Sequence, residues 1–176
     1  IHLINHHVDP RIKIRNQNKD LLNIGYFGEK ENGLYLDKLK DLLIPNYINT
    51  KKDSKFNWII ELEKYNAHYI VRKTNNKKVF KPFLKGFTAA HCESNVIAYK
   101  YDGDSEYYLT DEYPYMLEEN SYENILKMFN YMNETFNSDI WFYGLEIMRE
   151  IKYKSSEKFI ANQFKLLIKT IKDNDF

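Results

Sequence analysis

Short apolar runs that alternate with segments of helical periodicity constrain the fold of this chain more than any other feature of its sequence. Three runs are typical of buried strands: LLNIGYFGE (21–29), AHYIV (67–71) and NVIAYK (95–100). NYINT (46–50) is a weaker candidate, and YPYML (113–117) is a short extended segment. Strands that alternate with helices predict βαβ units and a mainly parallel sheet. We therefore expect an α/β fold, a Rossmann-like three-layer domain flanked by C-terminal helices.

Apolar residues with helical spacing fill the intervals between these runs. Leucines recur in this way from 34 to 43, and Pro45 would end that helix. Ser54 would cap a second helix, and Asn120 has the chemistry to cap a later one. Further helices are expected at 84–93 and about 139–152, with a last one after Ser155 or Ser156 that carries a long apolar stripe.

Size and composition limit the classes of protein to which the chain can belong. Its 176 residues, 43% of them hydrophobic, suffice for one well-buried domain. The net charge of +1 gives no overall field that would select nucleic acid, and no apolar run approaches the roughly 20 residues that cross a bilayer. The single Cys92 excludes an internal disulfide. We expect no nucleic-acid partner, no transmembrane segment, and a location in the cytoplasm or at the inner face of a membrane.

The chain divides into a short N-terminal segment and one domain. Residues 1–20 begin apolar and become polar, with a turn signal at Asp9-Pro10 followed by a solvated linker. Residues 21–176 are predicted to form the single domain. Because the chain begins with Ile1 and not with Met, we expect a partner domain upstream.

Polar loops follow three of the predicted strands. In parallel α/β sheets, ligands bind beyond the carboxyl ends of the strands, so the loops after residues 26, 71 and 100 would meet at one edge. The residues that they carry are Gly28 and Glu29, then Arg72 and Lys73 through Lys85, then Asp102-Gly103-Asp104.

The stretch KPFLKGFTAA (81–90) is a candidate anion site. Lys81 and Lys85 flank the expected start of a helix, where backbone N–H groups and the helix dipole favour a phosphate. Gly86 would let the backbone approach that phosphate closely. Thr88 would bond a ligand oxygen or, alternatively, its own backbone. The alternative for the lysines is a solvated basic loop.

A histidine cluster near the N-terminus raises the possibility of a metal site. His2, His6, His7 and Asp9 lie close together in the sequence. Zinc needs three or four convergent ligands, and adjacent residues of an extended segment point to opposite faces. We therefore expect no metal site.

The order of these segments resembles the C-terminal, nucleotide-sugar-binding lobe of GT-B-fold glycosyltransferases over most of the chain. HLINHHVDPRI resembles the crossing into that lobe, and NIGYFGE its first strand and glycine turn. TAAHCESNVIAYK resembles the small helix that precedes Pro-Val-Ile-Ala in the family, and SSEKFIANQFKLL its closing helices. Thr88 stands where retaining members usually place the Glu that holds the ribose, and Glu93 where they usually have Gly. These departures leave the stereochemistry of transfer open.

This resemblance implies a glycosyltransferase, or its donor-binding lobe, that transfers a sugar from a nucleotide-diphosphate sugar to a glycan, lipid or protein acceptor. It implies no cofactor besides that donor, no essential metal, and an N-terminal lobe upstream of Ile1. Alternatives are a non-catalytic nucleotide- or protein-binding module of the same fold, and a flavodoxin-like nucleotide-binding domain, although neither a GxGxxG nor a Walker pattern is present. The sequence singles out no catalytic residue. The expected donor and phosphate contacts are Gly28, Glu29, Arg72, Lys73, Lys81, Lys85, Gly86, Thr88 and Asp104.

Overall fold

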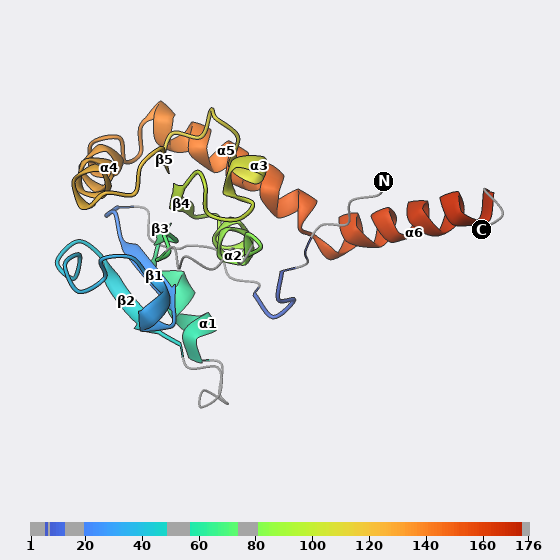
Figure 1. The fold of residues 1–176 in the computed structure, drawn as a ribbon, viewed down its shortest axis with the longest axis horizontal. Coiled ribbons are helices and arrows are strands. Elements are labelled where there is room, and N and C mark those ends of the chain that lie inside the picture. Colours follow the sequence, from blue (N-terminus) through green and yellow to red (C-terminus); the bar gives the residue numbers. More distant parts are fainter. Residues whose placement is uncertain (1–5, 7, 13–19, 49–56, 74–80, 174–176) are drawn as a thin grey trace.

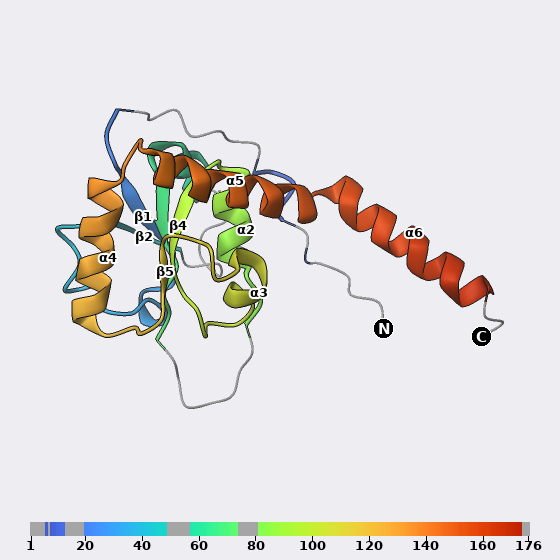
Figure 2. The same cartoon turned by 90° about the horizontal axis from the view of Figure 1, so that it is seen from above.

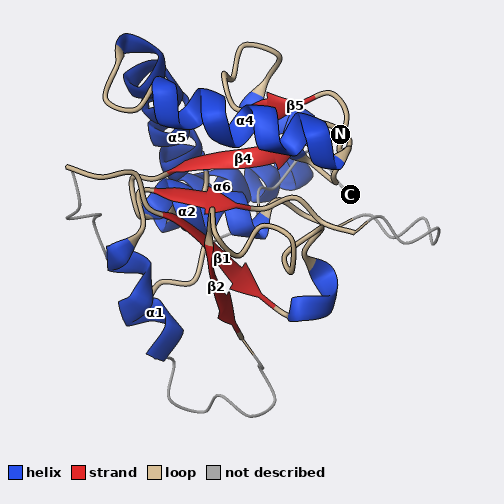
Figure 3. Cartoon of the chain, turned by 90° about the vertical axis from the view of Figure 1, so that its left-hand side faces the viewer, coloured by secondary structure: helices blue, strands red, loops and turns tan. Residues whose placement is uncertain are grey.

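A parallel sheet forms the centre of the computed structural model, which describes residue 6 and residues 8–12, 20–48, 57–73 and 81–173. Among these residues, five strands lie in the order β2-β1-β3-β4-β5, and every neighbouring pair is parallel (Figure 3). The predicted α/β fold with a parallel sheet is confirmed. The strands are β1 (Ile24–Gly28), β2 (Ile44–Tyr47), β3 (Ala67–Tyr69), β4 (Asn95–Tyr99) and β5 (Met116–Leu117).

The inner strands are buried on both faces, which explains why they appear as continuous apolar runs in the sequence. Tyr26 of β1, Tyr69 of β3 and Ile97 of β4 are fully buried. Registers such as Ile24 with Ala67, and Ala67 with Asn95, align these strands so that their carboxyl ends meet at one edge.

Helices cover both faces of the sheet (Figure 2). α4 (Tyr122–Glu134) lies on one face, and α2 (Leu84–His91) and α3 (Ser105–Leu109) lie on the other. α4 is capped by Ser121, one residue after the predicted Asn120, because the Ser121 hydroxyl accepts a hydrogen bond from the N–H of Asn124 at 3.3 Å.

α5 (Asp139–Lys154) runs past the amino-terminal end of β4. There the amide of Asn95 donates a hydrogen bond to the carbonyl of Trp141 (3.1 Å). This helix therefore closes the edge of the sheet opposite the one where the polar loops emerge.

α6 (Glu157–Asp173) projects away from the rest of the domain (Figure 1). Ser156 caps it, since its hydroxyl accepts a hydrogen bond from the N–H of Phe159 at 3.3 Å. Ile160 is buried, whereas Phe164 and Ile171 of the predicted apolar stripe are exposed. Among the described residues, none of the helices combines the length and the apolar character that crossing a bilayer requires.

The predicted helix over residues 34–43 is wrong, because this segment forms a series of turns. Tyr35 has a φ of 55°, a left-handed conformation that interrupts a helix. The N–H of Leu34 instead bonds the carbonyl of Val71 at 3.2 Å, which holds the segment against the end of β3. Leu39 and Leu43 are nevertheless buried, so the leucine spacing reflects core contacts made from turns.

Two other helix predictions fall partly outside the described residues. Ser54 lies there, and the helix expected after it appears as α1 (Asn57–Glu61) followed by a single 3-10 turn (Leu62–Lys64). In the N-terminal segment, the predicted turn is confirmed by a bond from the N–H of Ile12 to the carbonyl of Asp9 at 3.0 Å. Val8 and Ile12 are buried in the core of the domain, while the linker at 13–19 lies outside the described residues.

Candidate functional site

The strand order places a crevice between β1 and β3. The chain leaves β1 for β2 on one side and later continues from β3 to β4 on the other, so the loops after β1 and β3 diverge. Such a switch point is where open parallel sheets bind their ligands. The same strand order occurs in flavodoxin-like domains, so topology alone leaves that alternative open.

Lys85 lies in the first turn of α2 at this switch point. Its Nζ atom is 4.1 Å from the centroid of the Tyr26 ring and is shielded from solvent. Among the residues that the structure describes, this Nζ atom also has no hydrogen-bond partner. An ammonium group left without an acceptor in a shielded position is costly, and an anionic ligand would relieve that cost.

Gly28, at the end of β1, makes room for this ammonium group. Its φ of 149° is strained for residues with a side chain. A Cβ atom at this position would lie 2.9 Å from Nζ of Lys85 and 3.2 Å from the Tyr26 hydroxyl. The backbone carbonyl of the next residue, Glu29, accepts a hydrogen bond from the Tyr26 hydroxyl (2.6 Å). The exposed carboxylate of Glu29 accepts a hydrogen bond from the side-chain amide of Asn32.

Arg72 holds the loops of the site together. Its guanidinium lies 3.6 Å from a carboxylate oxygen of Asp102 and donates a hydrogen bond to the carbonyl of Pro82 at 3.2 Å. Both side chains of the ion pair are mostly buried, at 12% and 14% exposed. Gly103 lets the turn that follows Asp102 pack closely against the segment of Lys81 and Pro82. A Cβ atom at Gly103 would lie 1.9 Å from the carbonyl oxygen of Lys81.

The charges around Lys85 are mainly positive. Burial and, to a smaller extent, the nearby Arg72 lower the pKa of Lys85 to about 7, and Asp102 opposes the shift. The pKa of Asp102 is raised by its own burial, against the effects of Arg72 and Lys85. The site thus holds more cationic than anionic side chains, which suits a ligand with a negative charge.

A cavity of about 140 Å³ lies beside Lys85, under α1 and α2. His68 of β3 lines it and is 3% exposed, and its Nε2 atom has no hydrogen-bond partner in the described part of the chain. Burial, with a smaller effect of Lys85, lowers the pKa of His68 to about 3, so its imidazole is neutral at pH 7. The lining residues are Phe27, Ile48, Trp58, His68, Tyr69, Ile70, Leu84, Lys85 and Thr88.

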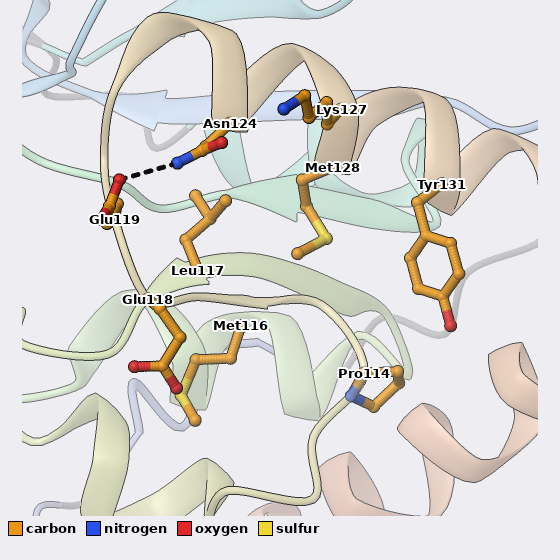
Figure 4. Close-up of a pocket in the computed structure, with 9 residues that line it drawn as sticks. All are labelled: Pro114, Met116, Leu117, Glu118, Glu119, Asn124, Lys127, Met128 and Tyr131. Carbon is orange, nitrogen blue, oxygen red and sulfur yellow. Dashed lines mark hydrogen bonds between the residues drawn. The ribbon is translucent and has the colours of Figure 1, made fainter.

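A larger and more open hollow of about 510 Å³ lies between β5 and α4 (Figure 4). Leu117 and Met128 line it, and Glu119 accepts a hydrogen bond from Asn124 at 3.1 Å. Within the described parts of the chain, the two buried side-chain atoms without a hydrogen-bond partner belong to His68 and Lys85, and both residues line the smaller cavity. We therefore place the candidate site there and not in the larger hollow.

The structure brings only some of the predicted site residues together. Gly28, Arg72 and Lys85 converge at the switch point. Lys73 and Lys81 are exposed. Asp104 precedes α3, and its carbonyl accepts a hydrogen bond from the N–H of Tyr108 at 3.2 Å.

Thr88 and Glu93 have structural partners. The hydroxyl of Thr88 donates to the carbonyl of Leu84 (3.1 Å), which is the backbone alternative, although Thr88 also lines the cavity. Glu93 forms an ion pair with Lys152 (2.9 Å) just after α2 and thus lies at the opposite edge of the sheet. In the histidine cluster, His6 is exposed, and His2 and His7 lie outside the described residues. Among the described residues, no three His, Cys, Asp or Glu side chains are grouped as metal ligands would be.

Gly86 has a packing role that the sequence did not indicate. A Cβ atom there would lie 1.9 Å from the ring of Phe83, which is 2% exposed and packs against Phe87 and Tyr108. The glycine is thus required by the aromatic core behind the site, whether or not a ligand approaches its backbone.

We expect Gly86→Ala to lower the free energy of unfolding by about 1–3 kcal/mol, because the added methyl group overpacks the Phe83 ring. Urea denaturation measures this change. In a Phe83→Leu background the same substitution should cost much less, since the smaller side chain leaves room. Unchanged stability with loss of ligand binding would instead assign Gly86 to the ligand.

No model of a known protein family matches the sequence, and no curated protein matches it either. The case for a function therefore rests on the fold and on the geometry of this site.

Proposed function

We propose that the domain is the donor-binding lobe of a glycosyltransferase, which transfers a sugar from a nucleotide-diphosphate sugar to a glycan, lipid or protein acceptor. The observation that carries this proposal is the shielded, unpartnered Nζ atom of Lys85 in the first turn of α2, at the β1/β3 switch point. A diphosphate is the ligand group that this arrangement fits best, since it brings negative charge to a site rich in cationic side chains.

The proposed chemistry uses the Lys85 ammonium group. When the bond between the sugar and the diphosphate breaks, negative charge grows on the leaving diphosphate. Lys85 and the N-terminal dipole of α2 would stabilise that charge, and they are already in place before the reaction. The proposal includes no metal and no cofactor, and it assigns the acceptor site and any catalytic base largely to another lobe.

A non-catalytic nucleotide- or protein-binding module is the second candidate. Thr88 and Glu93 favour this candidate, because their polar groups already have partners within the protein. The Thr88 hydroxyl bonds the carbonyl of Leu84, and the Glu93 carboxylate pairs with Lys152. Nucleotide binding without sugar transfer, by a chain that includes any upstream lobe, would support this candidate over the transferase.

We expect a nucleoside diphosphate to raise the melting temperature of the protein. A ligand at a hundredfold excess over Kd adds about 2.7 kcal/mol, which corresponds to roughly 5–10 °C for a domain of this size. Differential scanning fluorimetry with UDP, CDP, GDP and ADP at millimolar concentration tests this. If all four leave the melting temperature unchanged, the proposal loses its support.

The control for this experiment is chelation. EDTA should leave both the melting temperature and its increase by the nucleotide unchanged. An increase that appears only with added Mg²⁺ or Mn²⁺ would contradict a site in which protein cations neutralise the diphosphate.

A further inference from the structure

We propose that the cavity beside Lys85 holds the base of the nucleotide, and that His68 is the residue that hydrogen-bonds the edge of this base. The inference rests on the proposed function, because it assumes that the ligand is a nucleotide. It adds to that function a second subsite and a specificity-determining residue on β3.

The lining of the cavity suits a flat, neutral ring. Phe27 and Trp58 contribute aromatic side chains, and Ile48, Ile70 and Leu84 contribute aliphatic ones. The volume of about 140 Å³ is well below the roughly 300–1,000 Å³ of pockets that enclose a whole drug-sized ligand. The cavity thus has room for a part of a nucleotide, with the remainder outside.

Two residues that line the cavity, Lys85 and His68, each have an unpartnered atom, and these two atoms call for different ligand groups. Nζ of Lys85 is a donor that bears a positive charge when protonated and suits a phosphate oxygen. The His68 imidazole is neutral near pH 7, so Nε2 is either a donor or an acceptor of an uncharged hydrogen bond. A base edge presents such uncharged groups, whereas a phosphate does not.

The position of His68 on the strand directs it to this cavity. Successive residues of a strand face opposite sides of a sheet. Tyr69 packs against Phe129 of α4, with ring centroids 5.7 Å apart. His68 packs against Phe27 instead, at 5.1 Å, under α1 and α2. His68 thus faces the side of the sheet that α2 covers, where Lys85 also lines the cavity.

Trp58 offers a direct readout of the base. The chain has two tryptophans, and the second, Trp141, lies on α5 at the opposite edge of the sheet and is 3% exposed. In a Trp141→Phe protein, titration with uridine, cytidine, adenosine and guanosine should quench the fluorescence of Trp58 saturably for at least one nucleoside. Ribose 5-phosphate, pyrophosphate and free glucose should not quench it. In the otherwise unchanged protein, Trp58→Phe should abolish the same signal, which covers the case in which Trp141→Phe fails to fold.

His68→Phe tests the residue itself. It should weaken the binding of the preferred nucleoside about 5- to 10-fold, as expected for the loss of one net hydrogen bond, and leave pyrophosphate binding unchanged. The melting temperature should stay the same or rise, because the variant removes a buried polar atom that has no partner. Loss of pyrophosphate binding as well would show a merely structural role and overturn the inference.

The remaining outcomes separate this inference from the proposed function. If UDP binds in a manner that depends on Lys85 while nucleosides leave Trp58 unaffected, the inference fails and the proposed function stands. If free glucose quenches Trp58 saturably and nucleosides do not, a sugar occupies the cavity and the inference is overturned. If no nucleotide binds at all, the proposed function fails and the inference fails with it.

Discussion

Replacing Lys85 should weaken the binding of a nucleoside diphosphate by about 1.5–3 kcal/mol, or roughly 10- to 150-fold in Kd. The loss follows from its Nζ atom, which has no hydrogen-bond partner among the described residues and can bond a phosphate oxygen. Isothermal titration calorimetry measures the change. The bare nucleoside should bind Lys85→Ala as it binds the unchanged protein, because it has no phosphate to lose.

Lys85→Met is the sharper variant, because it keeps most of the aliphatic stem that lies over Tyr26. It removes an unpartnered ammonium group without opening a cavity, so the free energy of unfolding should rise while the affinity for the diphosphate falls. A substitution that only damaged the fold would lower both quantities.

The matched control is Lys81→Ala, an exposed residue four positions before Lys85, in the segment that leads into α2. It should weaken the diphosphate complex less than threefold, as expected for a solvated charge. Equal losses for Lys81→Ala and Lys85→Ala would indicate a diffuse basic loop. No loss for either would place the phosphate elsewhere.

The strands of the sheet could be predicted because a strand that is buried on both faces appears in the sequence as a short apolar run. AHYIV and NVIAYK are mostly apolar and do not alternate with polar residues, since helices cover the sheet from both sides. The order of strands and helices then sufficed to predict a parallel sheet and the edge at which its loops meet. This is why Gly28, Arg72 and Lys85 could be expected to converge.

The segment 34–43 could not be predicted in this way, because a distant contact decides its conformation. Its leucines have helical spacing, yet the bond between Leu34 and Val71 joins residues far apart in sequence. Tyr35 then adopts a left-handed conformation that no local signal announces. Local periodicity reports which side chains are buried, and it does not report whether a helix or a series of turns buries them.

The cavity was missed for a related reason. His68 lies within an apolar run, and Trp58 lies near the start of a short helix, so each side chain could equally have been an ordinary core residue. Their shared cavity exists only because β1, β3, α1 and α2 pack side by side. The one signal in the sequence was a histidine inside a buried strand, which calls for a hydrogen-bond partner that the sequence cannot identify.

The affinity for a nucleoside diphosphate should fall about tenfold per pH unit above pH 7. In the empty site, burial and the neighbouring Arg72 lower the pKa of Lys85 to about 7 from its ordinary value of 10.5. A bound diphosphate supplies the missing anionic partner and raises that pKa again. Between the two pKa values the complex holds one proton more than the free protein, so raising the pH weakens binding. Below pH 7 Lys85 is already protonated, and its contribution to the pH dependence disappears.

Proton uptake can be measured directly and distinguishes this mechanism from a general effect of pH. Calorimetry at pH 8.5 in buffers of different ionisation enthalpy should show close to one proton taken up per diphosphate bound, and none for Lys85→Met. The ligand itself contributes little there, because phosphate groups of this kind lose their last proton near pH 6. The stability of the empty protein should move in the opposite direction. Between about pH 7 and 10.5 the unfolded chain binds more protons at Lys85 than the folded protein does, so this residue makes the free energy of unfolding increase with pH. An affinity that is flat from pH 7 to 9, with no proton uptake, would mean that Lys85 is already fully charged in the empty site.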